Sequence, residues 1–229
     1  MVHEVRTRHS GQDNHEEHHY GRINIDSGSR GKRVDIQKPD VRSIVEDIEK
    51  GKIALPDFQR DFVWKSDDVQ DLLVSVLADY YIGTMLVIDD VKDEAGFKLR
   101  LVPGVPATTT ISSIVKILLD GQQRCSSLYY ALRAPDIPLS GRKNPSRFYL
   151  NVSSAMADDW QSTVETVHLN SKSALTKIDA DPNYIAFPLL LNAAALVVKL
   201  QERGQTDQIG GVVSSVSYTH LTLPTKRIV

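Results

Sequence analysis

Residues 114–124, with the sequence IVKILLDGQQR, join an apolar strand-like run to the start of a helix. The run is apolar except for Lys116 and is rich in β-branched side chains, which favours a buried strand. Asp120 and Gly121 then interrupt it, and a helix is predicted from there to about Arg133. A buried strand that turns through glycine directly into a helix indicates a fold in which helices pack against a sheet.

Hydrophobic periodicity on both sides of this segment predicts further strands and helices in mixed order. Asp40 is a good N-cap residue, and apolar side chains then recur at the spacing of one helix face up to Lys50. The other predicted helices are 66–77, 156–166 and 189–203, and the other predicted strands are 53–55, 85–88, 97–102 and 148–152. The predicted fold class is therefore α+β, with a small mixed sheet and helices packed around it.

Three parts of the chain differ in their apolar pattern. Residues 1–33 show little periodicity and are predicted to be a disordered leader, with a metal site on the leader's histidines as the alternative. Residues 34–204 contain the periodic segments and are predicted to form one domain. Residues 205–229 lose the pattern, and their end, SYTHLTLPTKRIV, resembles translated sequencing-adapter read-through. We therefore expect a non-native tail on a truncated protein, or else a genuine disordered C-terminus.

Composition excludes several classes of protein. Of the 229 residues, 41% are hydrophobic and 24% are charged, which excludes a wholly disordered chain. The formal net charge is −2, so any contact with DNA has to come from a local basic patch. A single cysteine excludes a disulfide framework and a multi-cysteine metal site. The sequence has no apolar run long enough to span a membrane and no signal-peptide core, which predicts a cytoplasmic protein without a membrane partner.

The segment LPDFQRDFVW (55–64) places a glutamine and an arginine between large aromatic side chains. Burial of aromatic anchors can fix an irregular loop and so hold Arg60 in one geometry. The expected anchors are Phe58, Phe62 and Trp64. Arginine suits phosphate because its planar guanidinium donates two parallel charge-assisted hydrogen bonds. The alternative is a packed surface loop in which Arg60 pairs with Asp57 or Asp61.

The turn Asp120-Gly121-Gln122-Gln123-Arg124 is the second candidate site. The first N–H groups of a helix lack internal partners and lie at the positive end of its dipole, and Gly121 lets the backbone approach a ligand closely. In such a turn Asp120 can hold a hydrated Mg²⁺, and Gln122 or Gln123 can orient a water. Arg124 can neutralise charge that develops on a phosphoryl group. The alternative is that Asp120 merely caps the helix.

Taken together, three segments carry a family resemblance. They are LPDFQRDFVW (55–64), YYIGTMLV (80–87) and LLDGQQRCSSLYYAL (118–132), in that order. In these segments the chain resembles the N-terminal domain of GmrSD-type restriction endonucleases, a ParB/sulfiredoxin-like family. The resemblance implies a ParB/sulfiredoxin-like fold over the domain at 34–204. It also implies binding and hydrolysis of a nucleoside triphosphate through the DGQQR motif, within an anti-phage system that cleaves modified DNA.

The resemblance also implies a set of site residues. The implied nucleotide site consists of residues 120–124 together with Gln59 and Arg60. Within it we expect the catalytic residues to be Asp120, Gln122, Gln123 and Arg124, and the further nucleotide-binding residues to be Gln59, Arg60 and Gly121. The Mg²⁺ expected from the chemistry of the turn is held by Asp120. Position 125 is usually apolar in the family, and here it is Cys125. A buried small hydrophobic residue is the expected role of this cysteine, and a redox cysteine is the alternative.

Partners are indicated less directly. After residue 133 the sequence contains only His168 and His220, too few for the HNH nuclease of larger family members, so we expect that nuclease in a missing domain or a separate subunit. A basic cluster can contact DNA phosphates, with a solvated loop as the alternative. Its members are Arg133, Arg142, Lys143 and Arg147. The rival functions are a non-catalytic ParB-like module that binds DNA or protein, and a weak intrinsic nuclease.

Overall fold

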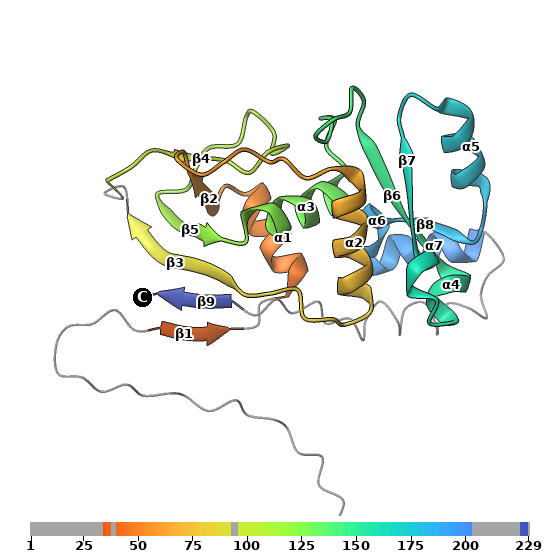
Figure 1. Ribbon diagram of the computed structural model, residues 1–229, viewed down its shortest axis with the longest axis horizontal. Coiled ribbons are helices and arrows are strands. Elements are labelled where there is room, and N and C mark those ends of the chain that lie inside the picture. Colours follow the sequence, from red (N-terminus) through yellow and green to blue (C-terminus); the bar gives the residue numbers. More distant parts are fainter. Residues whose placement is uncertain (1–33, 38–39, 93–95, 203–224, 229) are drawn as a thin grey trace, which may run out of the picture. The chain divides into compact units, whose positions relative to one another are not determined.

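The computed structural model describes residues 34–37, 40–92, 96–202 and 225–228. Its larger sheet has six strands in the order β1-β9-β3-β5-β2-β4 (Figure 1). They are β1 (Val34–Gln37), β9 (Thr225–Ile228), β3 (Met85–Lys92), β5 (Ile114–Asp120), β2 (Ile53–Pro56) and β4 (Leu99–Arg100). The central strand β5 runs antiparallel to β3 and parallel to β2, so the sheet is mixed, as predicted.

A second, smaller sheet is antiparallel, with the strand order β7-β6-β8. Its strands are β6 (Ser146–Asn151), β7 (Val164–His168) and β8 (Tyr184–Ala186). Within the described ranges the helices are α1 (Val41–Glu49), α2 (Ser66–Leu77), α3 (Gln122–Arg133), α4 (Val152–Met156), α5 (Lys172–Ala180), α6 (Phe187–Leu190) and α7 (Ala193–Glu202), with a 3₁₀ turn at Trp160–Ser162. The α+β class is confirmed.

Helix α3 lies in the middle of the core. It contacts α1, α2 and α6, and Figure 1 shows α1, α2 and α3 between the larger sheet and the strands of the smaller one. Ten of its twelve residues are buried. Tyr130 packs edge-on against Phe148, and its hydroxyl donates to the carbonyl of Ile137 and accepts from the N–H of Ser146. This buried hydroxyl is therefore satisfied, and its two hydrogen bonds tie the second half of α3 to Ile137 and to the start of β6.

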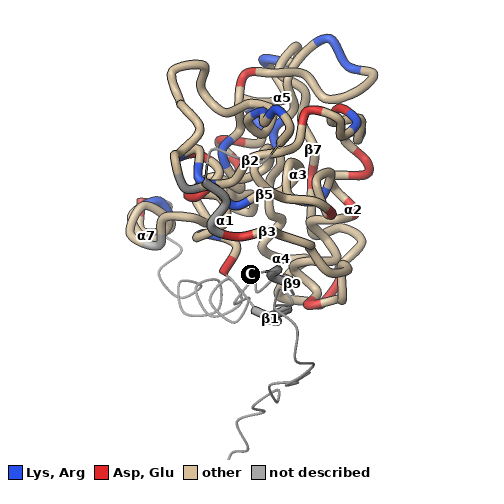
Figure 2. The backbone as a smooth tube through the Cα atoms, turned by 90° about the vertical axis from the view of Figure 1, so that its left-hand side faces the viewer, with Lys and Arg blue, Asp and Glu red and all other residues tan. Residues whose placement is uncertain are grey.

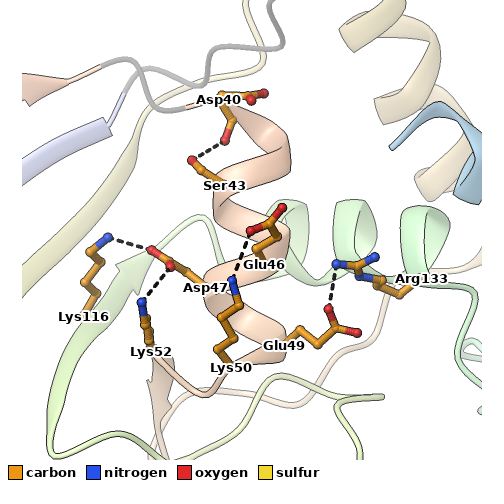
Figure 3. A network of polar contacts seen from close by, with 9 residues as sticks. All are labelled: Asp40, Ser43, Glu46, Asp47, Glu49, Lys50, Lys52, Lys116 and Arg133. Atoms are coloured by element: carbon orange, nitrogen blue, oxygen red, sulfur yellow. Dashed lines mark hydrogen bonds and ion pairs between the residues drawn. The ribbon is translucent and has the colours of Figure 1, made fainter. Parts of the chain in front are cut away.

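Helix α1 follows its sequence pattern closely. The carboxylate of Asp40 accepts a hydrogen bond from the N–H of Arg42, which confirms the predicted N-cap. The predicted apolar face is Val41, Ile44, Val45 and Ile48, and all four are buried. The polar face carries the ion pairs of Figure 3, in which Asp47 pairs with Lys116 of β5 and Glu49 pairs with Arg133 of α3. Both faces therefore tie α1 to its neighbours.

Several expectations need correction. The helix predicted at 156–166 is instead the end of α4, the 3₁₀ turn and strand β7, whose Val164 and Val167 side chains are buried. β-branched residues pack well on a pleated surface, and pairing with β6 overrides a weak helix pattern. The helix predicted at 189–203 is two helices, α6 and α7. Phe58 is not a buried anchor, since it is 68% exposed and packs edge-on against Phe97.

The predicted leader at 1–33 and residues 203–224 lie outside the described residues. Residues 205–229 are predicted to be a non-native or disordered tail. Of these, the structure describes Thr225–Ile228, which form β9 and pair with β1 and β3. Among the helices that the structure describes, none has the length and hydrophobicity needed to cross a membrane.

Candidate functional site

The turn between β5 and α3 is fixed by a glycine. Gly121 is the N-cap of α3 and has φ = +87°, a conformation that L side chains rarely adopt. A Cβ added there would lie 2.9 Å from Cγ of Met85, so the turn has no room for a side chain. Among the described residues no side-chain hydrogen bond caps the helix, and the interpretation of Asp120 as a simple cap is therefore wrong.

The start of α3 presents unpaired donors. The first hydrogen bond of the helix runs from the N–H of Cys125 to the carbonyl of Gly121. Within the described residues, no acceptor is found for the N–H groups of Gln122, Gln123 and Arg124. These groups lie at the positive end of the helix dipole, so the turn favours an anion.

Glutamines join this turn to the loop of residues 57–64. Nε2 of Gln122 donates to the carbonyl of Arg60 at 2.7 Å. Gln123 uses both ends of its amide, since Nε2 donates to the carbonyl of Asp61 and Oε1 accepts from the N–H of Val63.

The loop also reaches back to the sheet. Nε2 of Gln59 donates to the carbonyls of Leu118 and Leu119, at 2.9 and 3.0 Å, where β5 ends. Two motifs that are 60 residues apart in sequence are thus bonded to each other through side-chain amides and main-chain groups.

Arg124 joins the third segment of the resemblance to the turn. Its guanidinium donates to the carbonyls of Ile82 and Thr84, at 2.6 and 2.9 Å, and lies 3.7 Å from a carboxylate oxygen of Asp120. Gly83, with φ = +89°, makes room for it, because Cζ of Arg124 lies 3.2 Å from the place where a Cβ would be. Arg124 therefore holds residues 82–84, which precede β3, and also lies close to the carboxylate of the turn.

These contacts surround a cavity of about 360 Å³. Its lining consists of Gln59, Arg60, Trp64, Leu119 and residues 120–124. Every site residue predicted from the sequence lines this one cavity, so the two motifs contribute side chains to a common space. Sequence reasoning missed the lining roles of Trp64 and Leu119, although both are direct neighbours of the motifs. The cavity size is typical of small-molecule sites.

Positive charge exceeds negative charge around the cavity. Arg60 is exposed, and no partner for its guanidinium is found among the described residues, so the alternative ion pair with Asp57 or Asp61 is absent from that part of the chain. Asp61 instead lies 3.9 Å from Arg100, which also donates to the carbonyl of Arg60 and holds the loop. The residues that line the cavity thus carry two guanidinium groups, one carboxylate and three main-chain N–H groups for which no acceptor is found among the described residues. This balance favours an anionic ligand.

Asp120 is the one residue of the turn with chemistry suited to a metal ion. Its side chain is 72% exposed. Within the described ranges there is no group of three or more His, Cys, Asp or Glu residues placed to hold a metal. A single accessible carboxylate fits Mg²⁺, which keeps several waters and shares ligands with substrate phosphates.

Cys125 lies behind the turn and is 1% exposed. Burial raises the pKa of its thiol from 9.0 to about 12, and the nearby charge of Arg124 lowers it only in part. The group is therefore a neutral thiol at physiological pH and lacks the thiolate that redox chemistry needs. The expectation of a buried small hydrophobic residue is confirmed, and the structure does not support the redox alternative.

The basic cluster does not form one patch of free charges. Figure 2 shows basic and acidic residues interspersed along the chain. Arg133 pairs with Glu49 at 2.6 Å, and Arg142 donates to Oγ of Ser66 at 3.4 Å. Arg147 donates to main-chain carbonyls. Only Lys143 is without a partner among the described residues.

The protein is thus an α+β domain with a cavity built from the two motifs. Residues 41–204 match the family model of the GmrSD restriction endonuclease N-terminal domain, and the chain belongs to this family. It is also similar to an uncharacterized protein of Methanocaldococcus jannaschii, with 28% identity over 151 residues, which are 63% of this chain. The match spans 26% of the length of that relative.

Proposed function

We propose that the cavity binds the phosphates of a nucleoside triphosphate and that the domain hydrolyses the nucleotide. One observation carries the proposal: the unpaired guanidinium of Arg60 and three unpaired N–H groups of α3 border the same cavity. Both kinds of donor prefer phosphate oxygens, and the glutamine contacts hold them in place before a ligand arrives.

Each side chain has a distinct role in this proposal. Arg60 binds phosphate directly, since its guanidinium is free, and Gly121 lets phosphate approach the backbone. Arg124 keeps the site assembled through two main-chain carbonyls and adds positive charge near the transferred phosphoryl group. Asp120 would hold Mg²⁺, which when bound neutralises phosphate charge.

Family membership suggests the setting of this activity. We propose that the domain is the regulatory, nucleotide-dependent part of a restriction or anti-phage system that acts on modified DNA, and that its nuclease is another domain or subunit. A ParB/sulfiredoxin-like fold is part of the same proposal, supported by the mixed sheet and by the position of the phosphate turn at the end of a strand.

A second candidate is a non-catalytic module of the ParB type that binds DNA or protein. One observation favours it: the side chains of Gln123 and Arg124 both form hydrogen bonds to main-chain groups. In this alternative the motif is a structural brace, and the cavity binds a nucleotide or another anion without turning it over.

Phosphate release by the full chain separates the two candidates. The protein is incubated with Mg²⁺ and each of the four nucleoside triphosphates, with and without DNA, and binding is measured in parallel with a fluorescent non-hydrolysable analogue. Hydrolysis that is lost in Arg60→Ala supports the enzyme. Binding without phosphate release under any condition favours the non-catalytic module, and the absence of binding contradicts both nucleotide functions.

A further inference from the structure

Three glutamines line the cavity, and their amide groups are used differently. Gln123 has both polar atoms bonded to the main chain of the motif loop. Gln59 and Gln122 each have only Nε2 bonded, in both cases to main-chain carbonyls. Since a carbonyl only accepts, the bonded atom has to be the nitrogen, and the orientation of these two amides is fixed.

The two remaining oxygens differ in access. Oε1 of Gln59 is sealed within the protein and has no partner. Oε1 of Gln122 is also without a donor among the described residues, but it is not one of the sealed atoms. The Gln122 side chain is only 7% exposed, and it lines the cavity. Gln122 thus offers one fixed, accessible hydrogen-bond acceptor beside the N–H groups of α3.

An acceptor at this place constrains what lies next to it. Phosphate oxygens are acceptors themselves, so a fully ionised triphosphate cannot satisfy Oε1 of Gln122. A water molecule beside the terminal phosphate can satisfy this oxygen, because water donates a hydrogen bond to it and keeps a lone pair free for the phosphorus. Fixing a nucleophilic water in this way is a recognised route to faster phosphoryl transfer.

We propose that Gln122 is a catalytic residue whose Oε1 accepts a hydrogen bond from the attacking water, whereas Gln123 is a positioning residue. The proposal rests on the proposed nucleotide hydrolysis. The water oxygen forms a bond to the γ-phosphorus as the bond from that phosphorus to the β–γ bridging oxygen breaks. The electron pair leaves with the nucleoside diphosphate, one proton of the water passes to solvent, and the other stays on the released orthophosphate.

The two consecutive glutamines provide a matched pair of variants. Gln122→Met keeps the length of the side chain and removes the acceptor together with one bond to the loop. Gln123→Met removes two bonds to the loop but no free acceptor. We expect Gln122→Met to lower kcat by about 10²-fold with little change in nucleotide affinity. We expect Gln123→Met to weaken affinity, because the loop that carries Arg60 loosens, and to change kcat less.

Single-turnover phosphate release and binding of the fluorescent analogue are measured on variants whose melting midpoints match the wild type. Gln122→Glu, which keeps an acceptor oxygen, should recover part of the lost rate. Wild-type kcat in Gln122→Met overturns the assignment while leaving hydrolysis intact. If Gln122→Met weakens only nucleotide affinity, the oxygen contacts the nucleotide and the assignment is overturned. If higher Mg²⁺ restores the rate of Gln122→Met, the oxygen contacts the metal ion and the assignment is overturned as well. If the wild-type protein shows no turnover, the proposed hydrolysis is contradicted, and so is the catalytic role of Gln122.

Discussion

The cavity and the basic cluster are two regions to which the sequence assigns phosphate contacts, and the structure treats their arginines differently. In the cavity Arg60 is held by its own main chain, through bonds from Gln122 and Arg100, while its guanidinium stays free. In the basic cluster Arg133 is committed to a carboxylate and Arg147 to carbonyls. A guanidinium that has no internal partner and stands on a fixed backbone, as in Arg60, is better placed to bind an anion directly than one already bonded within the protein.

Density of charge along the sequence is therefore a poor guide to a binding surface. Arg133 ends α3 and points to α1, as Figure 3 shows, although Arg142 and Lys143 follow within ten residues. Arg60 has only one other basic residue within five positions, Lys65, yet it borders the cavity.

The largest effect is expected for Asp120→Asn, which tests whether the cavity is catalytic at all. The substitution keeps the size of the side chain and removes the charge that would hold Mg²⁺. We expect phosphate release to fall by about 10²- to 10³-fold, because a preorganised group is lost in the transition state. Stability should hardly change, since the carboxylate is 72% exposed and its pair with Arg124 is long. Full turnover in this variant would show that the carboxylate has no catalytic role.

The second prediction compares the effects of alanine substitutions at Arg60 and Arg133 on nucleotide affinity. Arg60→Ala should raise the dissociation constant of a nucleoside triphosphate by about 10- to 100-fold, the worth of a lost charge-assisted hydrogen bond. Arg133→Ala should leave nucleotide binding unchanged and lower the free energy of unfolding by about 1 kcal/mol or less, through loss of its pair with Glu49. Titration with a fluorescent analogue and urea denaturation measure the two effects. Equal losses of affinity in both variants would remove the distinction between the regions.

The third prediction compares a glycine from each region. Gly83 and Gly141 both have positive φ, but a Cβ on Gly83 would meet the guanidinium of Arg124, whereas a Cβ on Gly141 would meet nothing within 4 Å. Alanine costs about 1–3 kcal/mol of backbone strain at either position. Only Gly83→Ala should also displace Arg124 and weaken nucleotide binding. Urea denaturation measures the stability of both variants, and titration with the fluorescent analogue measures their nucleotide affinity. Unaltered affinity in Gly83→Ala would show that the site does not depend on the position of Arg124.

The last prediction concerns the pH dependence of stability that arises from the thiol of Cys125, the residue after Arg124. Burial raises the pKa of Cys125 to about 12 in the folded state, above its value of 9.0 when unshifted. The unfolded chain therefore loses this proton first as pH rises, and the folded state loses stability between about pH 9 and pH 12. Replacement by Ala should flatten the decline of the unfolding free energy over that range, relative to wild type. Below pH 8 the two proteins should show parallel pH dependence, and identical slopes above pH 9 would mean that the thiol is not buried.

Local pattern was sufficient to predict the elements that build the site. The N-cap of α1, the four buried positions of its apolar face, the strand–glycine–helix passage at Gly121 and the α+β class all follow from short-range physics of the chain. The pattern failed at residues 164–166, where pairing with β6 makes a strand of a segment predicted as helix. It also failed at Phe58, whose exposure depends on what the rest of the chain leaves uncovered.

The residues that line the cavity could be named from the two motifs, because the residue types there suit phosphate chemistry. The contacts that each of them makes depend on the folded chain. Gln122 and Gln123 are identical neighbours, yet one amide is fully bonded to the loop and the other keeps an oxygen free. Likewise Arg124 is bonded to two carbonyls of a segment 40 residues away, and Arg60 is not. The role of a polar side chain depends on which of its hydrogen-bonding atoms remain unpaired, and pairing is a property of the folded chain.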